Sequence, residues 1–96
     1  MELFIFGRFH AREGQESVVE EGVREVVALT RVEPGCINIH GFRSLRDPRL
    51  FYIHARWTDV DSFEVHARQP HTRRFLKTVE PLIDHPLDIT RAEVIG

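Results

Sequence analysis

Two histidines in the second half of the chain have the chemistry and the neighbours of an acid–base site. His66 follows Phe63 by three residues in a stretch with helical spacing, and His71 follows Pro70 at an expected helix start. A neutral imidazole near pH 7 can remove a proton to form a phenolate or a carbanion. We therefore take His66 as the candidate catalytic base, with a structural histidine that hydrogen-bonds a neighbouring loop as the alternative. For His71 the alternatives are a neutral site residue and an exposed loop histidine.

An aromatic residue and a glycine lie where a flat substrate could be held. Trp57 ends a predicted strand, where it can stack on a substrate and also close the end of the core. Gly7 interrupts the first predicted strand, and a strand glycine often marks a close approach by another group. We expect a pocket between helix and sheet. The predicted substrate-binding residues are Gly7, Ile53, Trp57, Phe63, His71 and Phe75.

A polar set lies on one face of a predicted hairpin, where Asn38, His40, His54 and Arg56 share parity. Two histidines without a nearby carboxylate make a poor metal site. We expect a polar patch inside a dimer, with an anion site built on Arg8 and Arg56 as the alternative. Neither a metal nor a cofactor is expected.

The remaining reactive or charged residues fit ordinary structural roles. Cys36 is the only cysteine, which excludes an internal disulfide and zinc sites built on several thiolates. We expect it to act as a small buried hydrophobic residue. The pair Arg73-Arg74 fits a solvated helix face, with an anion clamp at the pocket mouth as the alternative.

Composition limits the classes of protein that this sequence can be. The 96 residues suit one domain, 1–96, and 42% hydrophobic residues suffice for a small core. A net charge of −2 gives no basic field for nucleic acid. No apolar run is long enough to span a membrane, and the start, MELFIFGRFHARE, does not read as a signal peptide. We expect a cytoplasmic protein that binds neither nucleic acid nor membrane.

Hydrophobic periodicity predicts the elements that position these residues. Strands are expected over 2–10, 36–46, 49–57 and 87–95, the last with Ile95 on its apolar side. The middle pair forms a hairpin with a three-residue loop, which places Ile37 and Ile39 on its apolar face. Helical spacing covers 15–32, with an inward valine stripe, and a second stretch after Thr58 with Val60, Phe63 and Ala67 inward.

The order βαββαβ predicts an α+β, ferredoxin-like fold. Two helical crossovers and one hairpin give a four-stranded antiparallel sheet with both helices on one face. Apolar residues point to both faces of the first strand, so we expect a second copy to cover the bare face and form a homodimer.

Several motifs together resemble the antibiotic biosynthesis monooxygenase family. They are Glu33-Pro34-Gly35-Cys36 after the first helix, then Trp57, the acidic helix start at Asp59 and Asp61, His66, Pro70-His71 and Phe75. The resemblance implies a dimeric α+β barrel and small aromatic or quinol-like substrates, oxidised by O₂ without metal or flavin. Some relatives bind and degrade haem instead.

Three departures from the family pattern narrow the function. Ala55 stands where many members carry a glutamate, and Gly7 and Leu76 stand where haem-degrading relatives carry an asparagine and a histidine. Haem degradation is therefore not expected. The predicted function is O₂-dependent oxidation of a quinol or polycyclic phenol with His66 as base. The alternatives are a non-catalytic small-molecule binding or stress-related protein, and an isomerase or decarboxylase that uses a histidine base without O₂.

Overall fold

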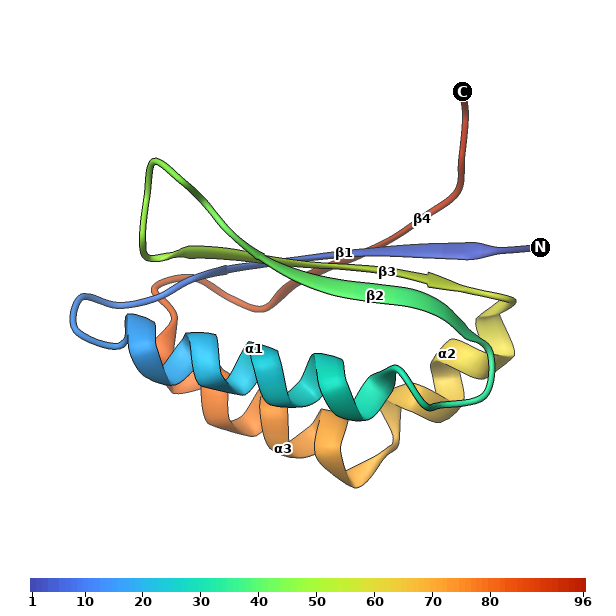
Figure 1. Ribbon diagram of the computed structural model, residues 1–96, viewed down its shortest axis with the longest axis horizontal. Helices are drawn as coiled ribbons and strands as arrows, with labels where there is room; N and C mark the ends of the chain where they lie inside the picture. Colours follow the sequence, from blue (N-terminus) through green and yellow to red (C-terminus); the bar gives the residue numbers. More distant parts are fainter.

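The computed structural model describes residues 1–96 as a helical layer packed on one side of an antiparallel sheet (Figure 1). Along the chain the elements are β1 (Leu3–His10), α1 (Glu16–Thr30), β2 (Cys36–Arg43), β3 (Leu50–Trp57), α2 (Val60–Ala67), α3 (Pro70–Val79), the 3₁₀ turn η1 (Glu80–Leu82) and β4 (Asp88–Ala92). The strand order is β2-β3-β1-β4. The predicted ferredoxin-like α+β fold is confirmed. None of the helices has the length and apolar character needed to cross a membrane.

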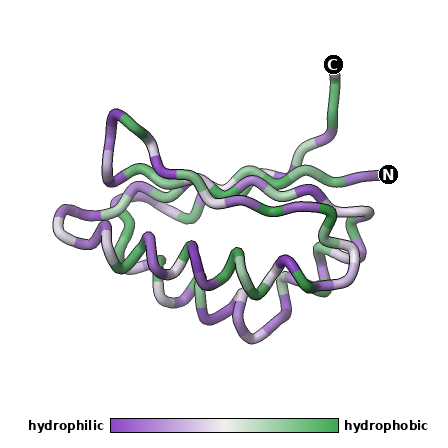
Figure 2. Tube along the Cα trace, in the orientation of Figure 1, coloured by the Kyte–Doolittle hydropathy of each residue, from purple (hydrophilic) through white to green (hydrophobic).

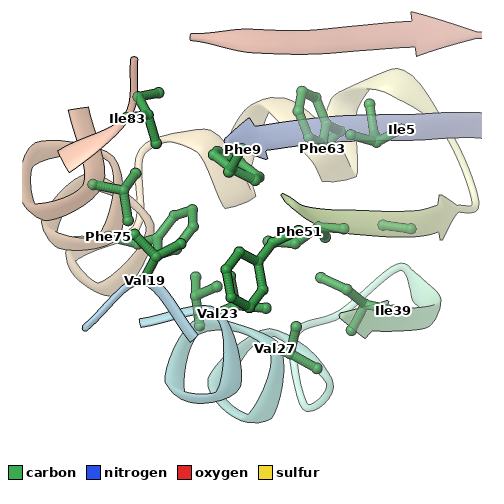
Figure 3. Packing of buried hydrophobic residues seen from close by; sticks show 14 of the residues in the cluster. Ile5, Phe9, Val19, Val23, Val27, Ile39, Phe51, Phe63, Phe75 and Ile83 are labelled. Atoms are coloured by element: carbon green, nitrogen blue, oxygen red, sulfur yellow. The ribbon is translucent and has the colours of Figure 1, made fainter. Parts of the chain in front are cut away.

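The core forms where alternate residues of the two central strands meet the helices. Phe9 of β1 and Phe51 of β3 are paired in register, and each side chain is only 1% exposed. Phe75 of α3 packs edge-on against Phe9, with ring centroids 5.4 Å apart. Figure 3 shows these rings meeting the inner valines of α1. The buried α1 residues are Val19, Val23, Val26, Val27 and Thr30, as the helical stripe predicted.

The turn after α1 is fixed to the start of α2. Gly35 has a φ of +86°, a conformation that favours glycine, and a Cβ there would lie 2.2 Å from Ser62 Oγ. The Thr58 amide also donates to the Gly35 carbonyl, at 2.9 Å. This close fit holds the residues just before the turn beneath the end of β3.

Two short helices follow β3. The Asp59 side chain accepts a hydrogen bond from the Ser62 amide at 2.7 Å and so caps the start of α2. α2 ends at Ala67, and Pro70 begins α3. The corner between them brings His66, in the last turn of α2, close to His71, in the first turn of α3.

Details of the predicted packing were wrong for local reasons. A register irregularity between Cys36 and Asn38 leaves Ile37 41% exposed, because Cys36 instead pairs with Trp57. The hairpin loop spans 44–49 and is longer than three residues. Val60 is exposed at the first position of α2, and Ile95 lies beyond the end of β4.

The face of the sheet opposite the helices carries no covering layer (Figure 1). Large apolar side chains stand on it, and the hydropathy-coloured tube shows hydrophobic stretches along the sheet as well as on the inner sides of the helices (Figure 2). Phe6, Phe42 and Tyr52 are 50%, 53% and 40% exposed. The 44–49 loop and the C-terminal segment both rise on this side of the sheet (Figure 1).

Candidate active site

A cavity of about 90 Å³ lies between the sheet and the helices. Its wall is mostly apolar and draws on both layers. Every predicted site residue except His71 contributes to it. The lining residues are Ile5, Gly7, Phe9, Val26, Thr30, Ile39, Ile53, Ala55, Trp57, Phe63, His66, Ala67, Thr72, Phe75, Leu76 and Ile89.

His66 is buried at one wall of this cavity and is held by Glu33. Its Nδ1 lies 2.9 Å from Glu33 Oε2, and the two side chains are 10% and 9% exposed. The ring packs against Trp57 in a tilted arrangement, with centroids 4.8 Å apart and an interplanar angle of 38°. Because an ionised carboxylate only accepts hydrogen bonds, Nδ1 is the donor, and in the neutral ring the lone pair lies on Nε2. His66 thus lines the cavity and also makes the hydrogen bond to a neighbouring loop that was considered from the sequence.

The second ring nitrogen of His66, Nε2, makes no hydrogen bond within the protein. Nδ1 is close to Glu33 and to Thr72 Oγ1, at 3.3 Å, whereas Nε2 has no hydrogen-bond partner. A base oriented by a carboxylate, with its other nitrogen free, is the arrangement that accepts a proton from a bound hydroxyl.

Glu33 is the site residue that the sequence analysis did not single out as functional. Its amide donates to the Thr30 carbonyl at 3.0 Å, and its carbonyl accepts from the Cys36 amide at 3.2 Å. These bonds fix the turn between α1 and β2 directly before Pro34-Gly35. The sequence feature that could have identified Glu33 is a carboxylate beside a Pro-Gly turn, at the same end of the sheet as Trp57.

His71 shares the same carboxylate but lies outside the cavity wall. Its Nε2 lies 2.7 Å from Glu33 Oε2, and its side chain is 17% exposed. It is therefore neither an exposed loop histidine nor, in this structure, a cavity-lining residue. Together, Glu33, His66 and His71 place three ligand-type atoms within 4.8 Å of one another.

Two other polar atoms at the cavity residues have no partner. Thr30 Oγ1 and Trp57 Nε1 are buried without a hydrogen bond, and both residues line the cavity. A buried polar group left unpaired costs about 1–3 kcal/mol. The cavity wall is thus mostly apolar and includes residues that carry unpartnered polar atoms.

The polar patch on the bare face does not form a second site. Arg56 forms a two-pronged pair with Glu2, with a shortest distance of 2.6 Å, so its guanidinium is already engaged there. The His54 ring lies 4.9 Å from the Phe6 ring. In the anion site considered for Arg8 and Arg56, Arg8 is therefore the one arginine whose guanidinium is not bonded to Glu2.

The other candidates are structural. Cys36 is partly buried, and burial raises the pKa of its thiol, which keeps it protonated and unreactive. Arg74 pairs with Glu25 of α1 on the outer surface of the helices, and Arg73 is exposed. Neither arginine lines the cavity.

Comparison with known proteins shows which family has a matching sequence pattern. The sequence pattern described as "Antibiotic biosynthesis monooxygenase" matches residues 3–78. A search of curated protein sequences found no match.

Solved structures match over nearly the whole chain. Rv0793 from Mycobacterium tuberculosis has a TM-score of 0.93 at 19% identity, with 100% of this chain and 97% of that chain covered. PA3566 from Pseudomonas aeruginosa has a TM-score of 0.90 at 26% identity, with coverages of 99% and 95%. A structure described as an antibiotic biosynthesis monooxygenase has a TM-score of 0.90 at 20% identity, with coverages of 98% and 99%.

Proposed function

The chain belongs to the antibiotic biosynthesis monooxygenase family, and on that premise we propose that it oxidises a small quinol or phenol with O₂, without a cofactor. The observation that carries the proposal is His66. Its Nδ1 is held by Glu33, its Nε2 is free, and the residue lines an apolar cavity with Trp57. His66 is the catalytic base, Glu33 positions it, and Trp57 and Phe63 shape the pocket.

The reaction begins with the proton of a substrate hydroxyl passing to His66 Nε2. The resulting phenolate gives one electron to O₂, and the superoxide and substrate radical combine into a peroxide anion at a ring carbon. This anion takes the proton back from His66 Nε2 to become a hydroperoxide, which restores the base. Breaking the O–O bond with loss of water leaves one oxygen atom in the product as a carbonyl. One O₂ is consumed for each water formed, and the substrate supplies all the electrons and both hydrogens of that water.

Cavity size favours a single-ring quinol over a polycyclic phenol. The cavity of about 90 Å³ is smaller than the roughly 150 Å³ cavity that takes up benzene in an engineered protein. A substrate must therefore displace part of the wall. Ile89 of β4 lines the cavity and is 40% exposed, and β4 makes few close contacts with the helices, so we place the entrance there.

The functional unit that we propose is a homodimer formed through the bare face of the sheet. The exposed Phe6, Phe42 and Tyr52 side chains support it, because Phe42 and Tyr52 are cross-strand neighbours and exposed apolar patches mark interaction sites. The catalytic cavity lies on the opposite side of the sheet, among the helices, and stays accessible in such a dimer.

A non-catalytic binding protein of the same fold is the second candidate. The observations that favour it are the small volume of the cavity and Ala55, which lies in its wall at 2% exposure and carries no functional group. This candidate retains the binding of a small aromatic molecule and lacks turnover.

Oxygen uptake with a panel of single-ring and fused-ring quinols and phenols tests the proposal. The protein is first treated with a chelator, and the absence of flavin is checked by its absorbance. We expect uptake of one O₂ per product. Product formed without O₂ uptake would instead indicate an isomerase or decarboxylase, and tight binding without any product would indicate the binding protein.

A further inference from the structure

We propose that Glu33, His66 and His71 also form a binding site for one divalent transition-metal ion of the Zn²⁺ or Co²⁺ kind. Two imidazole nitrogens and one carboxylate oxygen are a donor set that such ions prefer. The three ligand atoms are His66 Nδ1, His71 Nε2 and a Glu33 carboxylate oxygen, all within 4.8 Å of one another. Nothing in the family resemblance assigns a metal to them.

The spacing of the donors is close to what an ion requires. In a tetrahedral site with bonds of about 2.0–2.1 Å, neighbouring ligand atoms lie about 3.3 Å apart. Glu33 Oε2 already lies 2.9 Å from His66 Nδ1 and 2.7 Å from His71 Nε2. The two imidazole nitrogens have to draw together, which needs rotation of the side chains and no change of fold.

The backbone holds the three donors from separate elements. Glu33 comes from the fixed turn before β2, His66 from the last turn of α2 and His71 from the first turn of α3. Their side chains are 9%, 10% and 17% exposed, which shields the ion while leaving access beside His71. Three protein ligands leave the fourth position for water, as in open zinc sites.

Hydrogen bonds to Glu33 hold both donor nitrogens in the metal-free structure. Because a neutral imidazole carries a single ring proton, the proton on each donor nitrogen moves to the other ring nitrogen when an ion takes its place. His66 Nε2 and His71 Nδ1 have no outer hydrogen bond, and such bonds typically contribute 10–100-fold in metal affinity. We expect micromolar binding for that reason.

Metal binding and base catalysis exclude each other, a consequence that rests on the proposed function. An ion on Nδ1 of His66 moves the remaining ring proton to Nε2, the atom that must accept a proton from the substrate. The metal-loaded protein therefore lacks the base. The site acts as a metal-dependent brake on the same cavity.

Titration of chelator-treated protein with Co²⁺ tests the site, because tetrahedral Co²⁺ absorbs visible light far more strongly than the hydrated ion. We expect one equivalent to bind with a Kd below about 0.1 mM and Zn²⁺ to displace it. His71→Ala and Glu33→Gln should each weaken binding at least about tenfold. His40→Ala and Glu2→Gln, on the bare face and at its margin, are the matched controls, and circular dichroism verifies the fold of each variant.

The site is refuted if no saturable binding is found below that concentration, or if His71→Ala binds as tightly as the wild type. The titration contains no substrate. Co²⁺ binding without any oxidase activity would support the metal site and refute the proposed function. Oxidase activity without saturable Co²⁺ binding would support the proposed function and refute the metal site.

Discussion

The partner of His66 Nδ1 is a carboxylate, which only accepts hydrogen bonds and therefore favours the neutral imidazole form with its proton on Nδ1. Glu33 Oε2 accepts from His66 at 2.9 Å and from His71 at 2.7 Å. One acidic oxygen thus sets the tautomers of two imidazoles, and one of them faces the cavity. Replacing that oxygen by an amide nitrogen would remove this control, as in other sites where a carboxylate orients a histidine.

The sequence predicted the cavity residues around His66 but did not predict its carboxylate partner. Trp57, Phe63 and His66 were predicted to share a pocket, and all three line the cavity. Glu33 was missed because its role depends on a contact with a residue 33 positions away, across the fold. Periodicity reports which side of an element a residue occupies, and it carries no information about the end of another element that the side chain meets.

A second histidine, His10, joins two loops and makes stability depend on pH. Its ring bonds Asp84 at 2.6 Å and Asp47 at 2.9 Å, and these carboxylates, Asp84 foremost, raise the pKa of His10 above 6.5 against a smaller opposing effect of burial. The pKa of Asp84 is lowered chiefly by His10, and that of Asp47 by the Arg49 amide and then by His10.

The sign of each contribution follows from these directions. The histidine contribution is complete below pH 6.5 and is lost as pH rises through the higher folded pKa. The aspartate contributions are present above 3.8 and are lost as pH falls through the lower folded values. We expect the wild type to lose more stability than His10→Asn when urea unfolding is measured at about pH 5.5 and then at about pH 8.5. Equal losses in both proteins would contradict this role of His10.

At the scale of elements, the close contact of α1 with β2 depends on Gly41. A Cβ at Gly41 would lie 2.5 Å from Val23 Cγ1, which is buried in the core. We expect Gly41→Ala to destabilise the protein by about 1–3 kcal/mol in chemical unfolding, because the helix must move away from the sheet.

Gly22 provides the matched control for that substitution. It lies within α1, and a Cβ there would meet Phe75 at an ordinary 3.5 Å. Gly22→Ala should therefore stabilise the protein by about 0.5–1 kcal/mol through helix propensity alone. If both variants lose stability equally, tight packing at Gly41 is not what distinguishes them.

The elements whose patterns are long were the easiest to predict. The α1 stripe extends over four turns, so its buried face follows directly from spacing. Ile37 was placed on the wrong face because one irregularity in the pairing of β2 shifts every residue before it. Such an irregularity reflects how the strand fits its neighbour, and alternation within one strand does not reveal it.

At the scale of the whole molecule, the bare face of the sheet predicts self-association. A chain of 11.2 kDa has too little mass to cover both faces of a four-stranded sheet with its own helices. We expect sedimentation at micromolar concentration to give twice the chain mass, with more than about 1,000 Å² buried in total. Phe6→Lys, which places a charge at the centre of that face, should give the monomer. A wild-type protein that sediments as a monomer at this concentration would contradict the proposed homodimer.

We propose His66 as the base for oxidation in the cavity, and a substitution at this position separates that role from its hydrogen bond to Glu33. Glutamine at position 66 can still donate a hydrogen bond to Glu33, and it retains much of the imidazole volume. It has no nitrogen able to take up a proton near neutral pH. His40→Gln, on the bare face, makes the same chemical change away from the cavity.

The rate of O₂ consumption by His66→Gln, on the quinol that the wild type oxidises fastest, tests this claim most directly. We expect a fall of roughly 10²–10⁴-fold, the usual contribution of a general base, with an unchanged unfolding midpoint and a normal rate for His40→Gln. A His66→Gln protein that is folded and consumes O₂ at the wild-type rate would contradict it.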